Sequence, residues 1–433
     1  MTNIAADKKQ LLIVTYIFPP SSYVGVYRTL KYCKYINKDR WDLTVIAPKS
    51  VPEKKFINYK LLDEVPTNCK VHRTTDISPY SLFSSSNSKL GRFLKKIINK
   101  VCSYICIPDS HIFWFPFALV KGIALCRKNK YDIIYSSSPP HSTHIVSLYL
   151  AKLFNIKLVV DFRDPWGDEV FYKYNKRTRF TKWFETRQLN NVIKYSNKII
   201  TISKGEAIEL LNRFPNLNSE IVTHIENGFD PDDFAELNTE RKVNSQKRKL
   251  TFTYIGSIYE GTTEEFFKGL HILKNTNNEI YNELTINFIG SNTQYINTIS
   301  NKYDLSDIVE VTEYLPHAEC LAKLSSSDMN LILLGGNSFP ASEIPAKTYE
   351  YLFLKKPIFA VAKKGDLTEI LLNSGLGIVI EPNNPDLVAQ KIAELVHKNL
   401  NNTHVITPNH KYIENFNRAS LTKKFTNVLD NTT

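Results

Sequence analysis

A lysine and a glutamate, three residues apart, follow a buried-strand pattern in the second half of the sequence. The apolar run "MNLILL" precedes "SEIPAKTYEYL", in which Pro345 predicts the first turn of a helix. Lys347 and Glu350 then lie on one face of that helix. A cation near a helix N-terminus opposes the helix dipole by roughly 0.3–1 kcal/mol, and a bound anion reverses that penalty. Lys347 is therefore a candidate diphosphate ligand and Glu350 a candidate ribose ligand; the alternative is a solvated Lys/Glu pair.

Small residues follow three other strand patterns. Gly25 comes after the first strand, "QLLIVTY", and Arg28 follows it by one turn of the next predicted helix. Gly256 with Ser257, and also Gly290, end the strand patterns "KLTFTYIG" and "LTINFIG". Because glycine lets other groups approach the backbone closely, we expect these residues to contact a nucleotide. The alternative is that these glycines only form turns.

Polar and aromatic residues also follow two strand patterns of the first half. "DFRDPWGDE" comes after "IKLVV" and places Arg163, Asp164 and Trp166 where they could hold a sugar or a polar head group. The alternative is that Arg163 and Asp164 only pair with each other. "SSSPPHSTH" follows "YDIIY" and places His141 and His144 at the start of a helix, where a cap or a packed ring is the alternative role.

The elements that position these residues are continuous apolar strands alternating with amphipathic helices. Such strands are typical of parallel sheets covered on both faces, and the sequence contains two series of them. We therefore expect an α/β chain of two doubly wound Rossmann-like domains that face each other across a cleft. The polar stretch near residue 235 separates them, which gives domains of 1–234 and 235–408, and the last helix, within 409–433, crosses back to the first domain.

Composition narrows the class of protein. The chain has 433 residues and a formal net charge of +12, which favours an anionic partner. None of its six cysteines forms a C-x-x-C pair, so no zinc or thioredoxin-type motif is indicated, and a reducing cytosol is expected. The polar N-terminus predicts no signal peptide, and no apolar run approaches the roughly 18 residues of a membrane-spanning helix.

Two basic segments of the first half predict contact with a membrane surface. Residues 88–107 alternate apolar and basic positions at helical spacing, with Arg92, Lys95, Lys96 and Lys100 mostly away from the apolar side. This pattern suits an interfacial helix on an anionic bilayer. Residues 171–187, "FYKYNKRTRFTKWFETR", add further bases and aromatic rings. The alternative is an ordinary core-facing helix with a solvated basic face.

Taken in order, these stretches resemble the retaining glycosyltransferases of family 4, which have the GT-B fold. The likeness extends from "IVTYIFPPSSYVGVYR" through "VVDFRDPWGD" and "IENGFDPDDF" to "IPAKTYEYL", and is greatest to bacterial members that build surface polysaccharides. It implies a hexosyl- or N-acetylhexosaminyltransferase for capsule, O-antigen or exopolysaccharide synthesis. The donor would be a nucleotide sugar, with Glu350 on the ribose, Lys347 near the diphosphate and Gly25 against the phosphates. Arg28, Gly256, Ser257 and Gly290 would complete the donor site.

The resemblance also implies where the acceptor lies and how transfer proceeds. A lipid-linked or oligosaccharide acceptor would lie near His141, His144 and Asp164, with His141 and Asp164 as catalytic candidates and Arg163 and Trp166 as further contacts. Retention is drawn as front-face attack, with the donor phosphate as base and no metal. The "DPD" of Asp230 to Asp232 is discounted as a metal site because it lies in the predicted linker. The enzyme would be cytoplasmic and peripheral on the inner membrane.

Two departures from the family pattern concern the donor. Many relatives have two glutamates separated by seven residues; here Ser342 stands at the first position and Glu343 follows it, so Glu343 is a displaced catalytic candidate. Many relatives also have an arginine and a lysine after the first strand of the second domain, where this sequence has no cation before Lys268.

Two other functions compete with this interpretation. A nucleotide-sugar epimerase can have a similar two-domain architecture, whereas the lack of G-x-G-x-x-G after the first strand counts against a dehydrogenase. A non-catalytic protein could use the same basic surface to bind membranes or polyanions, with salt-dependent binding and no affinity for a sugar nucleotide.

Overall fold

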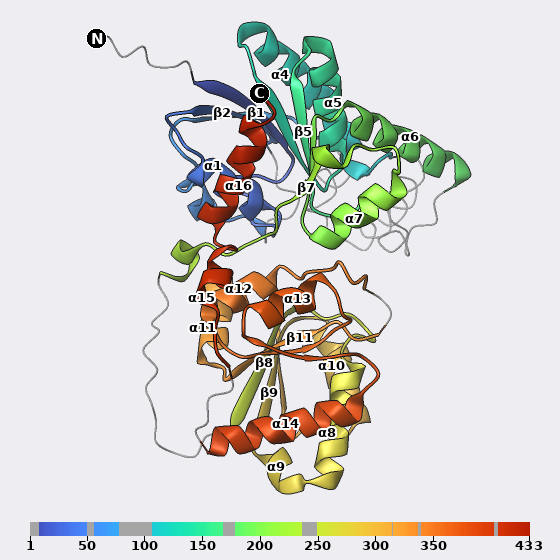
Figure 1. Cartoon of the computed structure of the whole chain (residues 1–433), viewed down its shortest axis with the longest axis vertical. Helices are drawn as coiled ribbons and strands as arrows, with labels where there is room; N and C mark the ends of the chain where they lie inside the picture. Colours follow the sequence, from blue (N-terminus) through green and yellow to red (C-terminus); the bar gives the residue numbers. More distant parts are fainter. Residues whose placement is uncertain are drawn as a thin grey trace, which may run out of the picture. The chain divides into compact units, whose positions relative to one another are not determined.

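The computed structural model of the chain contains two units (Figure 1). It describes residues 8–49, 56–77, 106–167, 178–235, 249–313, 315–336, 339–401 and 406–433. Unit 1 comprises residues 1–226 with 418–433, and unit 2 comprises residues 227–417. Each unit is built around one parallel sheet with helices on its two faces, so the predicted α/β fold of two doubly wound domains is confirmed.

Unit 1 contains a seven-stranded parallel sheet in the order β3-β2-β1-β4-β5-β6-β7. Its strands are β1 (Lys9–Thr15), β2 (Trp41–Pro48), β3 (Cys69–Thr74), β4 (Ile133–Ser138), β5 (Lys157–Phe162), β6 (Lys198–Thr201) and β7 (Val222–His224). The strands are apolar at consecutive positions because both faces are covered. In β1, Leu12 and Val14 pack into one core layer, whereas Leu11 and Ile13 pack into the other.

The helices of unit 1 cover both faces of its sheet (Figure 1). The described α-helices are α1 (Val26–Tyr35), α4 (Phe115–Lys128), α5 (Ser142–Phe154), α6 (Arg179–Tyr195), α7 (Lys204–Arg213) and α16 (Arg418–Asp430). Short 3-10 helices are η2 (Tyr59–Leu62), η3 (Ser110–Trp114) and η4 (Ser219–Ile221). Helix α16 lies alongside α1, where Phe425 stacks on Tyr32 with ring centroids 4.2 Å apart.

Unit 2 contains a six-stranded parallel sheet in the order β10-β9-β8-β11-β12-β13. Its strands are β8 (Leu250–Ser257), β9 (Leu284–Ser291), β10 (Val309–Thr312), β11 (Met329–Leu333), β12 (Ile358–Val361) and β13 (Gly377–Ile380). Its helices are η5 (Pro231–Phe234), α8 (Glu264–Thr276), α9 (Asn278–Asn282), α10 (Thr293–Lys302), α11 (His317–Ser326), α12 (Lys347–Leu354), α13 (Asp366–Asn373), α14 (Pro385–Leu400) and α15 (His410–Glu414). Figure 1 shows α14 lying across α8.

Strand order reverses once in each sheet, and this reversal determines where a ligand can bind. The reversal falls between β1 and β4 in unit 1, and between β8 and β11 in unit 2. The connections leave these strand pairs in opposite directions, which opens a crevice at the carboxyl ends of the strands. The candidate residues after β1, β4, β8 and β11 therefore lie where an open α/β sheet binds ligands.

The units divide at residues other than the expected 234/235 and 408/409. Phe229 and Phe234 belong to unit 2 because they pack in its core, and the Phe229 N–H donates to the Phe416 carbonyl oxygen at 3.0 Å. Only α16, which begins at Arg418, returns to unit 1. Two buried aromatic rings thus assign the first residues of the polar stretch to the core of unit 2.

Two predicted segments lie wholly or partly outside the described residues. Arg92, Lys95, Lys96 and Lys100 all fall within 78–105, and the first part of 171–187 falls within 168–177. Membrane contact at these positions stays a prediction. None of the described helices has both the length and the apolar character needed to cross a bilayer.

A buried ion pair joins helix α1 to strand β5. The Arg28 guanidinium donates to both carboxylate oxygens of Asp161, at 2.7 and 3.0 Å, and the two side chains are 1% and 0% exposed. Arg28 also donates to the Glu226 carbonyl oxygen at 2.9 Å, and the Tyr135 hydroxyl donates to Asp161. Burial disfavours the charged guanidinium, yet the neighbouring Asp161 carboxylate raises the pKa of Arg28 above its ordinary value.

Loss of one partner of this pair should destabilise unit 1. We expect Asp161→Asn to lower its free energy of unfolding by about 3–5 kcal/mol, because Arg28 would stay buried without a counter-charge. All four tryptophans of the chain are in unit 1, so tryptophan fluorescence during urea unfolding reports on this unit alone.

The matched control is Asp42→Asn, since Asp42 is 39% exposed and lies 4.0 Å from Lys8. Loss of that exposed pair should lower the free energy of unfolding by less than about 1 kcal/mol. Replacing both buried charges with Arg28→Met and Asp161→Leu should recover most of the lost stability. Equal losses for Asp161→Asn and Asp42→Asn would contradict the role given to the buried pair.

Candidate functional site

Helix α12 of unit 2 begins at Lys347, and its lysine is held over an aromatic ring. The Lys347 Nζ lies 3.2 Å from the centroid of the ring of Tyr254, in the second half of β8. The Tyr254 hydroxyl donates to the Ser257 carbonyl oxygen at 2.7 Å, which fixes the ring. Burial lowers the pKa of Lys347 well below its usual value, and the Glu350 carboxylate only partly opposes this shift. Burial and the helix dipole both disfavour the charged amine in the free chain, and an anionic ligand here would favour its protonation.

Glu350, one turn further along α12, has a partner that the sequence did not indicate. His317, the first residue of α11, lies with its Nε2 2.9 Å from Glu350 Oε1. Both side chains are accessible, at 46% and 31% exposure. His317 therefore positions the Glu350 carboxylate while leaving it within reach of a ligand.

The two glycines at the ends of β8 and β9 have different roles. Gly290 has a φ of +145°, and a Cβ at this residue would lie 2.1 Å from the Gly256 carbonyl oxygen. Gly256 pairs with Gly290, has a φ of +119°, and has no atom within 4 Å of the place a Cβ would take. Gly290 is thus explained by the close approach of the neighbouring strand, whereas the backbone at Gly256 remains open to a ligand.

Glu343 lies in the loop before α12 and is half-buried. Its N–H donates to the Pro340 carbonyl oxygen at 3.2 Å, and Ser342 beside it is buried. Lys268, the first cation after β8, pairs with Glu265 at 3.0 Å on α8. A role for Glu343 against the sugar stays a prediction.

In unit 1 the structure brings His141, His144 and Trp166 together. The rings of His141 and Trp166 stack with centroids 4.8 Å apart and planes 4° from parallel. His144 is completely buried in α5, and its Nδ1 lies 2.7 Å from Ser136 Oγ. Burial lowers the pKa of His144 well below its usual value, so this imidazole is neutral. His144 therefore packs behind the site, as the alternative role anticipated, and His141 at the helix start is nearer the surface.

Two of the cationic candidate residues, Arg163 and Arg28, are buried and bind groups of unit 1 itself. Arg163 donates from its backbone N–H and its Nε to the Ser138 carbonyl oxygen at 3.0 and 2.9 Å, and from its guanidinium to Pro139. The same guanidinium occupies the space beside Gly25, where a Cβ would lie 1.7 Å from Arg163 Nη1. The close approach predicted at Gly25 is thus made by Arg163. Arg28 is likewise committed to Asp161, so neither arginine presents its charge to a ligand.

Trp166 lies at a cavity within unit 1. Trp166, 3% exposed, donates from its Nε1 to Glu185 Oε1 of α6 at 3.1 Å. It lines a cavity of about 400 Å³ between the ends of β5 and β6 and helices α6 and α7. Half-buried Asp164 precedes it by two residues, and burial raises the pKa of its carboxyl group above the usual value. The largest part of the cavity wall is apolar; its charged members are Glu206, Glu209 and Arg213.

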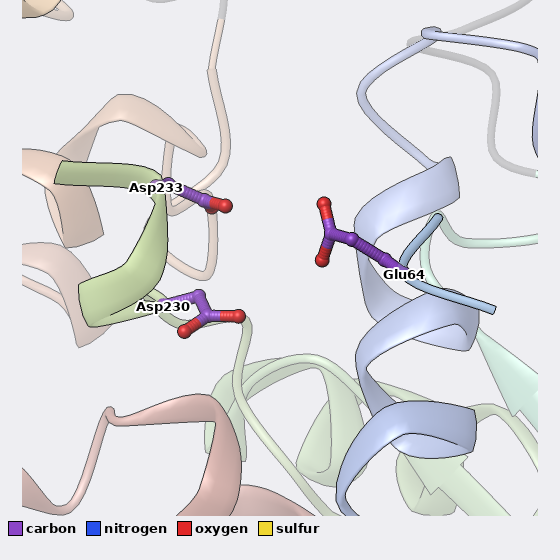
Figure 2. A group of neighbouring side chains, drawn as sticks. All are labelled: Glu64, Asp230 and Asp233. Atoms are coloured by element: carbon purple, nitrogen blue, oxygen red, sulfur yellow. The ribbon is translucent and has the colours of Figure 1, made fainter. Parts of the chain in front are cut away.

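The "DPD" sequence forms a turn in unit 2. Figure 2 shows the side chains of Asp230, which precedes η5, and Asp233, which lies within it. The Asp230 carboxylate accepts a hydrogen bond from the Asp232 N–H at 3.1 Å and caps this 3-10 helix. Glu64, also drawn in Figure 2, belongs to unit 1 and accepts a hydrogen bond from Lys31 Nζ at 2.6 Å.

Sequence reasoning missed His317, Tyr254 and the cavity. A signal existed for Tyr254, because it precedes Gly256 by two residues and so shares its side of the strand. His317 is 33 residues from Glu350 in sequence, so only the packing of α11 on α12 reveals their contact.

The buried His144 predicts a pH dependence of stability. Its pKa is lowered below the ordinary 6.5 in the folded chain, so below about pH 6.5 the unfolded chain binds a proton that the folded chain does not. Stability should therefore fall as the pH decreases from 6.5 toward the lowered value. We expect His144→Gln to lose less stability over this range than the wild type, by up to about 1.4 kcal/mol per pH unit, in urea unfolding followed by tryptophan fluorescence. If stability changes with pH equally in the wild type and in His144→Gln, protonation of His144 does not lower the stability of the folded chain.

The lowered pKa of Lys347 predicts proton uptake on binding of a nucleoside diphosphate. A diphosphate beside the amine would raise its pKa, so binding between the lowered value and the ordinary 10.5 should draw in a proton. Calorimetry with UDP in buffers of different ionisation enthalpy measures this uptake. Lys347→Arg is the matched control, because it keeps the charge but does not titrate. If wild type and Lys347→Arg bind with the same proton exchange, Lys347 does not contact the diphosphate.

Comparisons with known proteins agree with this arrangement. Residues 30–233 match the sequence model of the family described as Glycosyltransferase Family 4. No curated protein matches the sequence. Among solved structures, a glycosyltransferase from Rickettsia africae has 15% identity and a TM-score of 0.57, and the alignment covers 98% of this chain and 99% of that one.

Two further structures show how widely the fold is shared. HepE from Anabaena, solved in complex with UDP and glucose, has 12% identity and a TM-score of 0.61, with 98% of this chain and 100% of that chain covered. The UDP-GlcNAc 2-epimerase from Methanocaldococcus jannaschii has 13% identity and a TM-score of 0.53, with 98% and 99% covered. At these identities the likeness shows the fold alone. The chain thus has the GT-B fold of glycosyltransferases, and residues 30–233 match the model of Glycosyltransferase Family 4.

Proposed function

We propose that this protein is a retaining glycosyltransferase that moves a hexosyl or N-acetylhexosaminyl group from a nucleotide sugar to a lipid-linked saccharide. The observation that carries the proposal is the geometry at the start of α12. Lys347 is held there at the strand-order reversal of unit 2, and Glu350 follows one turn later on the same helix. The proposed pathway is bacterial capsule, O-antigen or exopolysaccharide synthesis, on the resemblance of the sequence to such enzymes.

The donor would bind to unit 2 through its diphosphate and its ribose. Free N–H groups at the start of α12 and the Lys347 amine would bind the diphosphate, and Glu350 would accept hydrogen bonds from the ribose. The open backbone at Gly256 and Ser257 would lie against the nucleotide. The complex of HepE with UDP and glucose supports a donor of this class for the fold.

The acceptor would bind to unit 1 beside Trp166. The cavity there has an apolar wall and a few charged groups, which suits a sugar ring or the proximal part of a lipid carrier. His141, which stacks on Trp166, and Asp164, two residues before it, would orient the acceptor hydroxyl. His144 would contribute indirectly, by supporting the ring of Trp166, since their centroids lie 6.1 Å apart.

Retention needs no protein nucleophile in this scheme. The departing diphosphate would accept the proton of the acceptor hydroxyl while the new bond forms on the face from which it leaves. Lys347 and the N–H groups of α12 would stabilise the negative charge that develops on the diphosphate. A metal ion is not part of the proposed mechanism.

An epimerase is the alternative function, since the neighbour from Methanocaldococcus jannaschii shares the fold. An epimerase would convert its nucleotide sugar without any acceptor, whereas a transferase would release nucleoside diphosphate only as the acceptor is glycosylated. A cytoplasmic location at the inner membrane surface is part of the proposed function, supported by the charge of +12.

Replacement of Glu350 tests the donor site. We expect Glu350→Ala to weaken binding of UDP, or of the nucleotide that the wild type selects from UDP, GDP and dTDP, by about tenfold or more, because hydrogen bonds from the ribose to a carboxylate are lost. Transfer should fall at least as far. Ligand-observed NMR or calorimetry measures binding, and release of nucleoside diphosphate measures transfer.

The control for this change is Glu394→Ala, which removes a glutamate of α14 that is 41% exposed and paired with Lys391 and Lys398. It should leave nucleotide binding unchanged. Near-normal turnover by Glu350→Ala would overturn the donor assignment, and binding of none of the nucleotides by the wild type would favour the non-catalytic alternative.

A further inference from the structure

The outer face of α6 exposes three aromatic side chains. Phe180, Trp183 and Phe184 are 67%, 58% and 38% exposed to solvent. Their rings are neighbours, with centroids 6.1 to 6.5 Å apart. A contiguous apolar surface of this kind is typical of a binding site rather than of a solvated helix.

The spacing along α6 explains why these rings cannot join the core. Residues 180, 183, 184 and 187 lie on one side of a helix, because they are three or four positions apart. The opposite side supplies Thr181, Glu185, Leu189 and Val192, which are buried against the rest of unit 1. Helix α6 is thus apolar on two sides, and only one of them has a partner within the described part of the chain.

The charges on α6 select the kind of partner. Arg179, Lys182, Arg187 and Lys194 are all exposed, and Glu185, the single acidic residue of the helix, is buried. The Arg187 guanidinium lies 5.9 Å from the Trp183 ring. The exposed surface of α6 therefore combines aromatic rings with cations and contains no carboxylate.

We infer that this aromatic and basic face of α6, formed by Phe180, Trp183 and Phe184 with Arg179, Lys182 and Arg187, docks on an anionic lipid bilayer. Aromatic rings enter the boundary between head groups and acyl chains, while arginine and lysine reach the lipid phosphates. Each cation near an anionic leaflet adds to the affinity. The net charge of +12 attracts the whole protein to the same surface.

Two other occupants fit the face less well. A second copy of the chain would bring the cations of α6 against the same cations in a symmetric pair, which is unfavourable without acidic partners. A nucleic acid would satisfy the cations, but the three rings lie on the convex side of a single helix rather than in a groove that tracks a strand.

This inference deepens the proposed function, because a lipid-linked acceptor requires an enzyme at the bilayer. Its test does not depend on transfer, since vesicle binding needs neither donor nor acceptor. Transferase activity without vesicle binding would overturn the docking surface alone. Vesicle binding without any transfer would support the surface and overturn the proposed reaction.

Trp183 provides a direct signal of docking. Of the four tryptophans, Trp41, Trp114 and Trp166 are buried, at 0%, 0% and 3% exposure, so Trp183 dominates the response to an external surface. Adding phosphatidylcholine vesicles that contain phosphatidylglycerol should shift its emission to shorter wavelength, and lipids brominated near the head group should quench it. Vesicles of phosphatidylcholine alone should have little effect.

Two sets of variants separate the contributions of rings and charges. The triple variant Phe180→Ala, Trp183→Ala and Phe184→Ala should lower the vesicle partition coefficient at least tenfold in sedimentation, an order of magnitude expected for interfacial aromatic rings. Arg179→Gln, Lys182→Gln and Arg187→Gln together should lower it about a hundredfold, and salt should produce a similar loss. The matched controls are Tyr59→Ala and Ile208→Ala, which remove exposed apolar side chains elsewhere in unit 1 and should bind as the wild type does.

Unfolding followed by circular dichroism establishes that the variants are folded. Unchanged vesicle binding by the aromatic variant would overturn the inference. A wild-type dimer that the aromatic variant abolishes, with no vesicle binding, would assign the face to a second copy of the chain. Wild-type binding to single-stranded oligonucleotides but not to anionic vesicles would likewise overturn the inference in favour of a nucleic acid.

Discussion

The buried pair of Arg28 and Asp161 is the interaction on which the rest of unit 1 depends. It joins helix α1, which follows β1, to the end of β5, and so fixes the two sides of the strand-order reversal against each other. Tyr135 and the Glu226 carbonyl oxygen complete its hydrogen bonds. A bidentate pair satisfied in this way tolerates burial, whereas either partner alone would not. Arg163 extends the same layer by filling the space that Gly25 leaves open.

Unit 2 uses a different constraint at the equivalent place. Burial and the dipole of α12 both disfavour the charged form of Lys347, and the Tyr254 ring compensates for part of this cost. A buried amine with a strongly lowered pKa at a strand end is typical of a functional site. At the strand ends of unit 1 Arg28 is paired with Asp161 and Arg163 donates to carbonyl oxygens of the fold, whereas Lys347 of unit 2 has no such committed partner among its described contacts. This asymmetry supports assigning the anionic donor to unit 2.

Much of the fold and part of the site could be predicted from the sequence. Continuous apolar strands gave both parallel sheets, and the position of Lys347 and Glu350 after β11 followed from the strand-end rule. The ion pair of Arg28 could not be predicted, because its partner Asp161 lies 133 residues away in sequence and only the topology brings the two together. The contact of His317 with Glu350 could not be predicted for the same reason. The periodicity of apolar residues predicts strands and helices, but it does not predict which distant side chains pair.

Helix α6 carries two features on its two sides: part of the wall of the cavity beside Trp166, and the exposed aromatic and basic face. Its inner side accepts a hydrogen bond from Trp166 through Glu185 and supplies Leu189 to the cavity wall. Its outer side carries Trp183 and Phe184 among exposed cations. Since one helix is only about 10–12 Å across, a bilayer at the outer side would lie within a lipid's reach of a site at the inner side. An acceptor anchored in that bilayer by its lipid could then present its saccharide to the cavity beside Trp166. Glu185 lies on the inner side, where it orients the tryptophan, and the outer side of α6 carries no carboxylate that would repel an anionic leaflet.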